Sequence, residues 1–227
     1  HVLYYRINPR RVLENHNYIG IFNSKNIDKL IKKFNILIKT VSPFLPEFDS
    51  CNISRIDYCS NVELNDQAVI DSYINLLKRG YFPSKYTIKK YKNEKSKRNT
   101  LSKNGITITG NNGIEVTYYN KYRRKQSIFK DFEIWWFDNS KKIIRIEIRC
   151  FKKKVRHLTK KFKCTSASSF LKESDIIGKY IFKHYANIFY GTGDFYKLTD
   201  IYAMIDKSSC KKKSKKLMKE LVKSSAT

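Results

Sequence analysis

The sequence predicts an α+β fold, with an antiparallel sheet, helices packed on one face of it, and a C-terminal helical segment. Three observations lead to this class. Segments with the two-residue alternation of strands and segments with the spacing of amphipathic helices both occur before residue 155. Residues 107–114 carry Asn112-Gly113, a dipeptide that favours a tight turn between antiparallel strands. The remainder has mainly helical spacing, and strands followed by helices are typical of α+β proteins.

The N-terminal part is predicted to form one strand and one helix. Residues 2–13 read as a strand that Pro9 interrupts. Asn23-Ser24 can cap a helix, and Pro43 ends it. Between them, apolar side chains recur at helical spacing, at Ile27, Leu30, Ile31, Phe34, Ile38 and Val41.

A second strand and helix follow. Residues 51–64 are predicted to form a strand in which Ile56 and Tyr58 share one face while Arg55 and Asp57 share the other. A helix then begins at Asp66 and closes at Arg79-Gly80. Its inner side is expected to carry Val69, Tyr73, Leu76 and Leu77.

The middle of the chain is predicted to add further strands to the sheet. Residues 86–104 begin as a strand and continue as a basic loop. The hairpin at 107–114 leads into a returning strand that starts at Glu115. Residues 142–152 form the clearest strand, in which Ile144, Ile146 and Ile148 alternate with Arg145, Glu147 and Arg149.

The C-terminal part is predicted to be helical, at Ser166–Lys172, Asp175–Phe189, 196–206 and 211–223. We expect one domain at 1–172 and a C-terminal helical segment at 173–227. Two alternatives stay open for that segment. It forms a separate helical or winged-helix appendage, or its helices pack on the main sheet.

The charge of the chain indicates a polyanionic partner. Its 47 Lys and Arg against 20 Asp and Glu give a net charge of +27, which points to nucleic acid first and to an anionic membrane second. An AT-rich genome would raise the Lys content by itself, but it does not explain the shortage of acids. The cations are spread along the chain rather than gathered on one amphipathic helix, which argues against a membrane. Aromatic residues make up 14% of the chain, and rings between cations suit stacking on unpaired bases.

Other chemistries find little support in the sequence. The five cysteines form no CxxC pair, and the four histidines have no zinc-ligand spacing. An odd, scattered set of cysteines indicates reduced thiols and a cytoplasmic protein. No apolar run is long enough to cross a membrane, and no phosphate-loop pattern occurs.

The strongest functional signal is a tyrosine-rich, basic stretch at residues 115–125. A phenol, with a pKa of about 10, is a poor nucleophile at neutral pH. Nearby cations or a metal would favour the phenolate that covalent catalysis needs. The alternative is that Tyr118 belongs to the core while Tyr119 and Tyr122 flank a basic, phosphate-contacting strand end.

Alternation on three strands predicts a shared polar face. Two acids on neighbouring strands, Asp57 and Glu147, are a reasonable site for Mg²⁺ or Mn²⁺. Such an ion would polarise a phosphodiester for attack by an adjacent tyrosine. The alternative is that the two acids form ordinary ion pairs with Arg55 and Arg145. The same alternation adds to this face Glu115, Thr117, Tyr119 and Lys121.

Three short blocks resemble the replication initiation factor family, which contains rolling-circle replication initiators of bacterial plasmids and phages and related relaxases of conjugative elements. The blocks are Ser54-Arg55-Ile56-Asp57, Tyr119-Asn120-Lys121-Tyr122 and Ile144-Arg145-Ile146-Glu147-Ile148. Their order, their spacing and the basic chain around them carry the resemblance. It covers roughly residues 50–155.

The resemblance implies an origin-specific endonuclease and strand transferase. Such an enzyme nicks one DNA strand, stays joined to the 5′-phosphate through a tyrosine and leaves a 3′-OH. We then expect residues 1–172 to form the nicking (catalytic) domain and residues 173–227 to form a C-terminal helical DNA-binding segment. Asp57 and Glu147 are then expected to bind Mg²⁺ or Mn²⁺. Tyr119 or Tyr122 is the nucleophile, and alternation favours Tyr119, with Lys121 stabilising the phenolate or the phosphate. DNA contacts are expected from Arg55, Arg123, Arg124, Arg145 and Arg149.

One departure from the family pattern leaves the ligand set open. The family often has an acid just after the second tyrosine, where this chain has Arg123-Arg124, so Glu115 or Glu133 could substitute. Expected partners are origin DNA, double-stranded and exposed single-stranded, a host helicase and a second copy of the chain. The alternative function is a non-catalytic basic DNA-binding protein that recognises an origin or packages nucleic acid.

Overall fold

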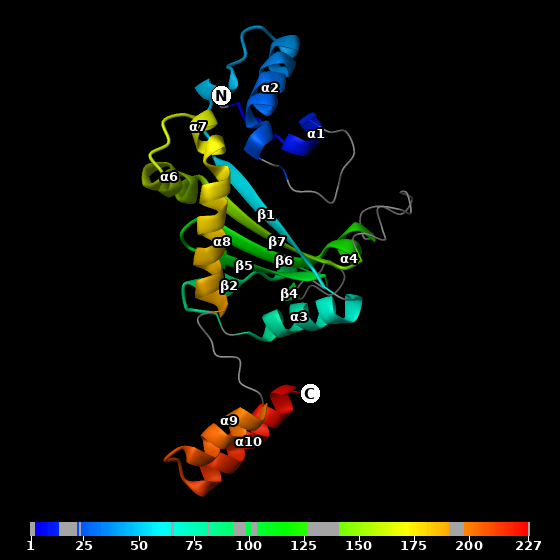
Figure 1. Cartoon of the computed structure of the whole chain (residues 1–227), viewed down its shortest axis with the longest axis vertical. Helices are drawn as coiled ribbons and strands as arrows, with labels where there is room; N and C mark the ends of the chain where they lie inside the picture. Colours follow the sequence, from blue (N-terminus) through cyan, green and yellow to red (C-terminus); the bar gives the residue numbers. More distant parts are fainter. Residues whose placement is uncertain are drawn as a thin grey trace. The chain divides into compact units, whose positions relative to one another are not determined.

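The computed structural model describes residues 3–13, 22, 24–64, 66–80, 82–92, 99–100, 104–126, 141–190 and 198–226. The chain divides into two compact units, His1–Phe189 and Tyr190–Thr227 (Figure 1). The first unit holds the sheet and the candidate site.

A five-stranded antiparallel sheet with the strand order β1-β7-β6-β5-β2 forms the centre of the first unit (Figure 1). Its strands are β1 (Arg55–Glu63), β2 (Tyr86–Ile88), β5 (Gly105–Gly110), β6 (Ile114–Asn120) and β7 (Ile143–Phe151). The short strands β3 (Tyr91–Lys92) and β4 (Asn99–Thr100) pair separately. Together with the helices, this sheet confirms the predicted α+β class.

The predicted hairpin joins β5 to β6. Its turn lies between Gly110 and Ile114, which are partners in the register of the two strands. Gly113 has a φ of +77°, a left-handed conformation that glycine adopts without a Cβ clash. The Asn-Gly signal therefore marks the turn correctly.

Helices α6 (Lys152–Lys161), α7 (Ala167–Lys172) and α8 (Ser174–Tyr190) cover the apolar face of the sheet (Figure 1). On α8, Ile177, Ile181 and Tyr185 recur every four residues and are at most 1% exposed, because they pack against strand residues such as Val116 and Ile148. α8 is thus part of the main core. The division between the units falls after Phe189 rather than after residue 172, and of the two alternatives for the C-terminal segment, packing on the sheet holds for α8.

Helix α3 (Gln67–Arg79) begins as the sequence predicts, because the Asp66 side chain accepts a hydrogen bond from the Val69 amide at 2.9 Å. Its buried side is different from the predicted one. Ile70 and Ile74 are buried against Ile144. Tyr73 and Leu76, which we expected inside, are 51% and 64% exposed.

The N-terminal segment forms a small second core. Residues 3–8 belong to no helix or strand, and Pro9 begins helix α1 (Pro9–Leu13), so the strand predicted at 2–13 is wrong where the structure describes it. Proline suits the first position of a helix, because a backbone N–H at that position has no hydrogen-bond partner within the helix and its absence costs nothing. Tyr5, Phe34 and Phe48 then pack edge to face. The surrounding elements are η1 (Ser24–Asn26), α2 (Ile27–Val41) and η2 (Phe48–Ser50).

The described residues of the second unit form two helices, α9 (Leu198–Lys207) and α10 (Lys212–Ala226). Lys219 on α10 pairs with Asp206 on α9 at 2.6 Å. This helical C-terminal region agrees with the predicted class. Among the described helices, none combines the length and the apolar composition that a membrane-spanning helix needs.

Candidate functional site on the polar face of the sheet

The face of the sheet opposite α6 and α8 carries the predicted polar residues. The strand register places Asp57 beside Arg149, and Arg149 beside Glu115. One step further along the strands, Glu147 pairs with Thr117. Tyr119 and Arg145 form the next pair. We call these seven residues the polar face: Asp57, Glu115, Thr117, Tyr119, Arg145, Glu147 and Arg149.

Arg149 lies at the centre of the polar face and contacts three carboxylates. Its Nε is 3.3 Å from Asp57 Oδ2, its Nη1 is 3.2 Å from Glu115 Oε2, and its Nη2 is 3.5 Å from Glu147 Oε2. The side chain of Arg149 is 23% exposed, and Glu115 and Glu147 are less exposed still. Coulomb attraction at such partly buried sites is stronger than on an open surface.

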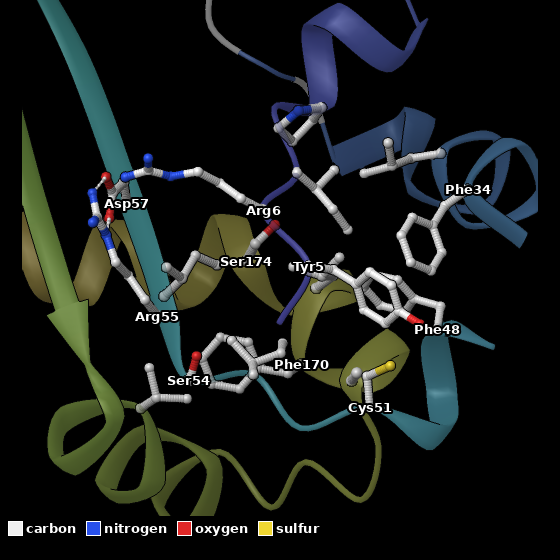
Figure 2. A pocket seen from close by; sticks show the side chains of 18 of the residues that line it. Tyr5, Arg6, Phe34, Phe48, Cys51, Ser54, Arg55, Asp57, Phe170 and Ser174 are labelled. Atoms are coloured by element: carbon white, nitrogen blue, oxygen red, sulfur yellow. Dashed lines mark hydrogen bonds and ion pairs between the residues drawn. The ribbon is translucent and has the colours of Figure 1, made fainter. Parts of the chain in front are cut away.

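Each of these carboxylates also has a second cation. Arg55 binds Asp57 through two hydrogen bonds of 2.8 and 2.6 Å (Figure 2). Lys89 binds Glu115 at 2.9 Å, and Arg145 lies 3.8 Å from Glu147. Burial alone would raise the pKa of Glu115, but its hydrogen bonds with Lys89 and Arg149 hold that pKa below its ordinary value. Glu115 is therefore ionised at neutral pH, and all three carboxylates are paired with cations.

Tyr119 is joined to this cluster through Glu147. Its hydroxyl donates a hydrogen bond of 2.6 Å to Glu147 Oε1, and the side chain of Arg124 lies over its ring at 4.2 Å from the centroid. Burial and the negative charge of Glu147 raise the pKa of Tyr119 above its ordinary value, and the cations Arg145 and Arg124 offset this only in part. The expectation that neighbouring cations favour a phenolate is therefore not met in this arrangement. Tyr119 is a protonated phenol that faces a carboxylate base.

The residues after Tyr119 depart from the predicted alternation. β6 ends at Asn120, and Lys121 begins helix α4 (Lys121–Gln126). Lys121 is 3% exposed, and the strand alternation that was expected to place it on the polar face ends one residue before it. Tyr122 is half-buried, and Lys141 Nζ lies 5.9 Å from the centroid of its ring. Of the two candidate tyrosines, Tyr119 alone hydrogen-bonds a polar-face carboxylate among the described residues.

A buried amide that the sequence reasoning missed sets the end of β6. Asn120 is fully buried and donates to Gln67 Oε1 at 2.6 Å. Its own Oδ1 accepts from the Arg123 amide at 3.1 Å, which caps the start of α4. Arg123 in turn pairs with Asp71 on α3. Asparagine is a good helix cap, and its position directly before Lys121 is the signal that could have placed this boundary.

The predicted metal site has suitable ligand types but is filled by a guanidinium. Asp57, Glu115 and Glu147 supply the hard oxygen atoms that Mg²⁺ prefers, yet all three bind Arg149. Cys59, opposite Glu147 in the register, offers a soft sulfur atom that does not suit Mg²⁺, and burial raises the pKa of its thiol to about 11. In the part of the chain that the structure describes, no group of three or more acidic, His or Cys side chains could hold an ion. With Arg149 in this position, the site does not fit a divalent ion, and Glu133 lies outside the described residues.

The five predicted DNA-contacting arginines all bind other groups of the protein. Arg55, Arg145 and Arg149 pair with polar-face carboxylates. Arg123 pairs with Asp71, and Arg124 covers Tyr119.

Comparison with models of known families, with curated proteins and with solved structures finds no match for this chain. The resemblance to replication initiation factors therefore rests on the three short sequence blocks. In space, all three blocks contribute side chains to one polar face.

Proposed function

We propose that the chain is a DNA-nicking and joining enzyme with Tyr119 as its nucleophile, acting as a rolling-circle replication initiator or relaxase. The observation that carries this proposal is the hydrogen bond of 2.6 Å from the Tyr119 hydroxyl to Glu147, among the arginines of the polar face. A phenol, a carboxylate base and phosphate-binding cations in one place are the groups that such a reaction requires. The net charge of +27 supports DNA as the substrate.

The proposed reaction follows from this arrangement. The Tyr119 oxygen forms a bond to the phosphorus while Glu147 accepts the phenolic proton. The bond from phosphorus to the 3′-oxygen breaks, and that oxygen takes a proton from water to become the 3′-OH. The 5′-phosphate stays on Tyr119, so its bond energy is conserved, and attack by a 3′-OH rejoins the strand. Arg145 and Arg149 would stabilise the charge on the phosphate.

The reaction requires side-chain movement at the site. Tyr119 is 8% exposed and Arg124 covers its ring, so DNA reaches the hydroxyl only after such neighbours move aside. An incoming phosphate gives Arg124 and Arg149 a new anionic partner, which favours this rearrangement. Dependence on Mg²⁺ or Mn²⁺ stays a prediction, and no step above depends on an ion.

The test is the formation of a covalent adduct. Single-stranded oligonucleotides with a randomised central region carry a fluorophore at the 3′ end and are incubated with the protein, with and without Mn²⁺. An adduct that keeps the 3′ label on a denaturing gel is expected for wild type and for Tyr122→Phe, and it should be absent for Tyr119→Phe. If both tyrosine variants form the adduct, the assignment of the nucleophile is lost.

The second candidate is the non-catalytic DNA-binding protein. The pairing of each polar-face carboxylate with two cations favours it, because such a network also stabilises a purely structural surface. Wild-type protein that binds the oligonucleotide pool but forms no adduct in either condition would support this candidate.

A further inference from the structure

A large groove adjoins the polar face in the first unit. It has a volume of about 2940 Å³ and lies between the N-terminal segment, α2, the outer edge of β1 and helices α6 to α8 (Figure 2). Arg55, Asp57, Arg145 and Glu147 line it. Glu147 is the partner of Tyr119, so the groove extends to within one hydrogen bond of the proposed nucleophile.

The groove is strongly basic. Ten Lys and Arg side chains line it, against four Asp and Glu. The acids are engaged within the protein. Asp57 and Glu147 pair with arginines, Asp49 accepts from the Ser168 amide at 2.9 Å at the start of α7, and Asp175 binds the Ser24 hydroxyl. The lining therefore presents a surplus of positive charge to whatever enters.

Helix α6 contributes a regular row of cations to one wall. Lys152, Arg156 and Lys160 follow one another at intervals of four residues and all line the groove, so successive charges rise about 6 Å along the helix axis. The other lysines of this helix include Lys153 and Lys161, which are exposed but do not line the groove. Among the described carboxylates, none forms an ion pair with the three cations of the row. A row of unneutralised charges at this spacing suits consecutive phosphates of an extended strand.

The opposite wall adds further cations and an exposed ring. Arg6 extends from the N-terminal segment toward Arg55 and Asp57 (Figure 2), and Lys33 on α2 also lines the groove. Tyr4 lines the groove and is 75% exposed, whereas its neighbour Tyr5 is packed on Phe34. An exposed aromatic ring among cations is a platform for an unpaired base, which a duplex keeps inside its stack.

We propose that this groove binds single-stranded DNA, with the phosphates along the Lys152–Arg156–Lys160 row and a base on Tyr4, and that it leads the strand to the polar face. Only the second part of this inference, that the groove leads the strand to the polar face, rests on the proposed function. The binding itself requires no chemistry at Tyr119.

The test measures binding of oligo(dT) of about 20 nucleotides by fluorescence anisotropy at several salt concentrations. All variants are made in the full chain carrying Tyr119→Phe, so that no adduct contributes to the signal. Arg156→Glu with Lys160→Glu replaces two cations of the row with carboxylates. Lys153→Glu with Lys161→Glu is the matched control, because it makes the same change of charge on the same helix outside the groove.

The groove variant is expected to bind about 20-fold more weakly, and its slope of log affinity against log salt should fall by about 1.4, since each single-strand phosphate contact contributes about 0.7. The control should change affinity less than about threefold. Tyr4→Ala should weaken binding about tenfold with the salt slope unchanged, because stacking releases no counterions. Circular dichroism checks that each variant is folded.

Several results would overturn the inference. Equal loss in the groove variant and its control would mean that only net charge matters. Duplex DNA, single-stranded RNA or an acidic peptide that binds more tightly than oligo(dT) and responds to the same variants would identify another occupant.

The two proposals fail separately. Binding with the expected variant pattern but no adduct from wild type would overturn the enzyme and leave the groove. An adduct that forms equally well when the groove substitutions are made with Tyr119 intact would leave the enzyme and overturn the groove.

Discussion

Arg149→Met tests whether one guanidinium organises the polar face. The substitution keeps an unbranched apolar stem like that of arginine and removes the cation that contacts Asp57, Glu115 and Glu147. Losing one partner of a fully buried ion pair costs about 3–5 kcal/mol, whereas an exposed pair contributes under about 1 kcal/mol. The three carboxylates are 12% to 31% exposed, and each keeps its second cation. We therefore expect the free energy of unfolding to fall by about 2 kcal/mol at pH 7.

The loss of stability in Arg149→Met should depend on pH. Glu115 has a lowered pKa in the folded protein, so its ion pairs stabilise the fold above the unfolded-state pKa of about 4.3 and lose that effect as the pH falls through the folded-state value. In Arg149→Met, Glu115 should protonate at higher pH than in wild type, because it has lost one of the two cations that lower its pKa. The difference between the two proteins should thus be largest at pH 7 and clearly smaller at pH 4.

The assay is urea denaturation followed by far-UV circular dichroism at pH 7 and pH 4. Arg123→Met is the matched control, because the Arg123 side chain is 48% exposed and pairs with Asp71 alone among the described carboxylates. It should cost about 0.5 kcal/mol. A loss for Arg149→Met that equals the loss in this control, or that stays constant between the two pH values, would refute the central role of Arg149.

Two further predictions concern the same region. Arg149→Met should bind Mn²⁺ at least tenfold more tightly than wild type in isothermal titration calorimetry, because it frees three carboxylates for a hard cation. Adding Asp57→Asn to Arg149→Met should remove this gain in affinity. Equal Mn²⁺ affinities in all three proteins would contradict the carboxylate site. Asn120→Ala should lower the free energy of unfolding by about 2 kcal/mol, because Asn120 is fully buried and its hydrogen bonds with Gln67 and Arg123 would be lost. A loss below about 0.5 kcal/mol in urea denaturation would show that this amide does not hold the end of β6.

The faces of the central strands could be predicted because alternation is a local property of the sequence. Side chains on β7 point to opposite faces in turn, so Glu147 and Arg149 fall on the polar side and Ile148 on the apolar side. The hairpin turn was equally predictable, since Asn112-Gly113 has a local conformational preference.

The neighbours of each residue across the sheet were not predictable from alternation. The contacts of Arg149 with Asp57 and Glu115 depend on the register between strands that are far apart in the sequence. The sequence alone does not show this register, so the contacts of the polar-face acids with Arg149 could not be foreseen and a metal site was expected. The raised pKa of Tyr119 has the same origin, because it arises from burial and from Glu147 on the next strand.

Three features of the helices could not be predicted because tertiary contacts decide them. The alternation of β6 would have continued to Lys121, but Asn120 is held by Gln67 on α3 and caps α4. For α8, the sequence left open a separate appendage or packing on the sheet, and its apolar row packs on the sheet. On α3, several spacings of apolar residues were compatible with a helix, and the contact with Ile144 selected Ile70 and Ile74.

The central claim is that the Tyr119 hydroxyl attacks DNA, and peptide mapping of a DNA adduct by mass spectrometry tests it most directly. Wild-type protein is incubated with the oligonucleotide pool, the adduct is digested with trypsin and nuclease, and the modified residue is sequenced. The account predicts a phosphonucleotide on Tyr119 and its absence in Glu147→Gln, which keeps the shape of the side chain but loses the base. A nucleotide on another residue, or no modified peptide under any condition, would contradict it.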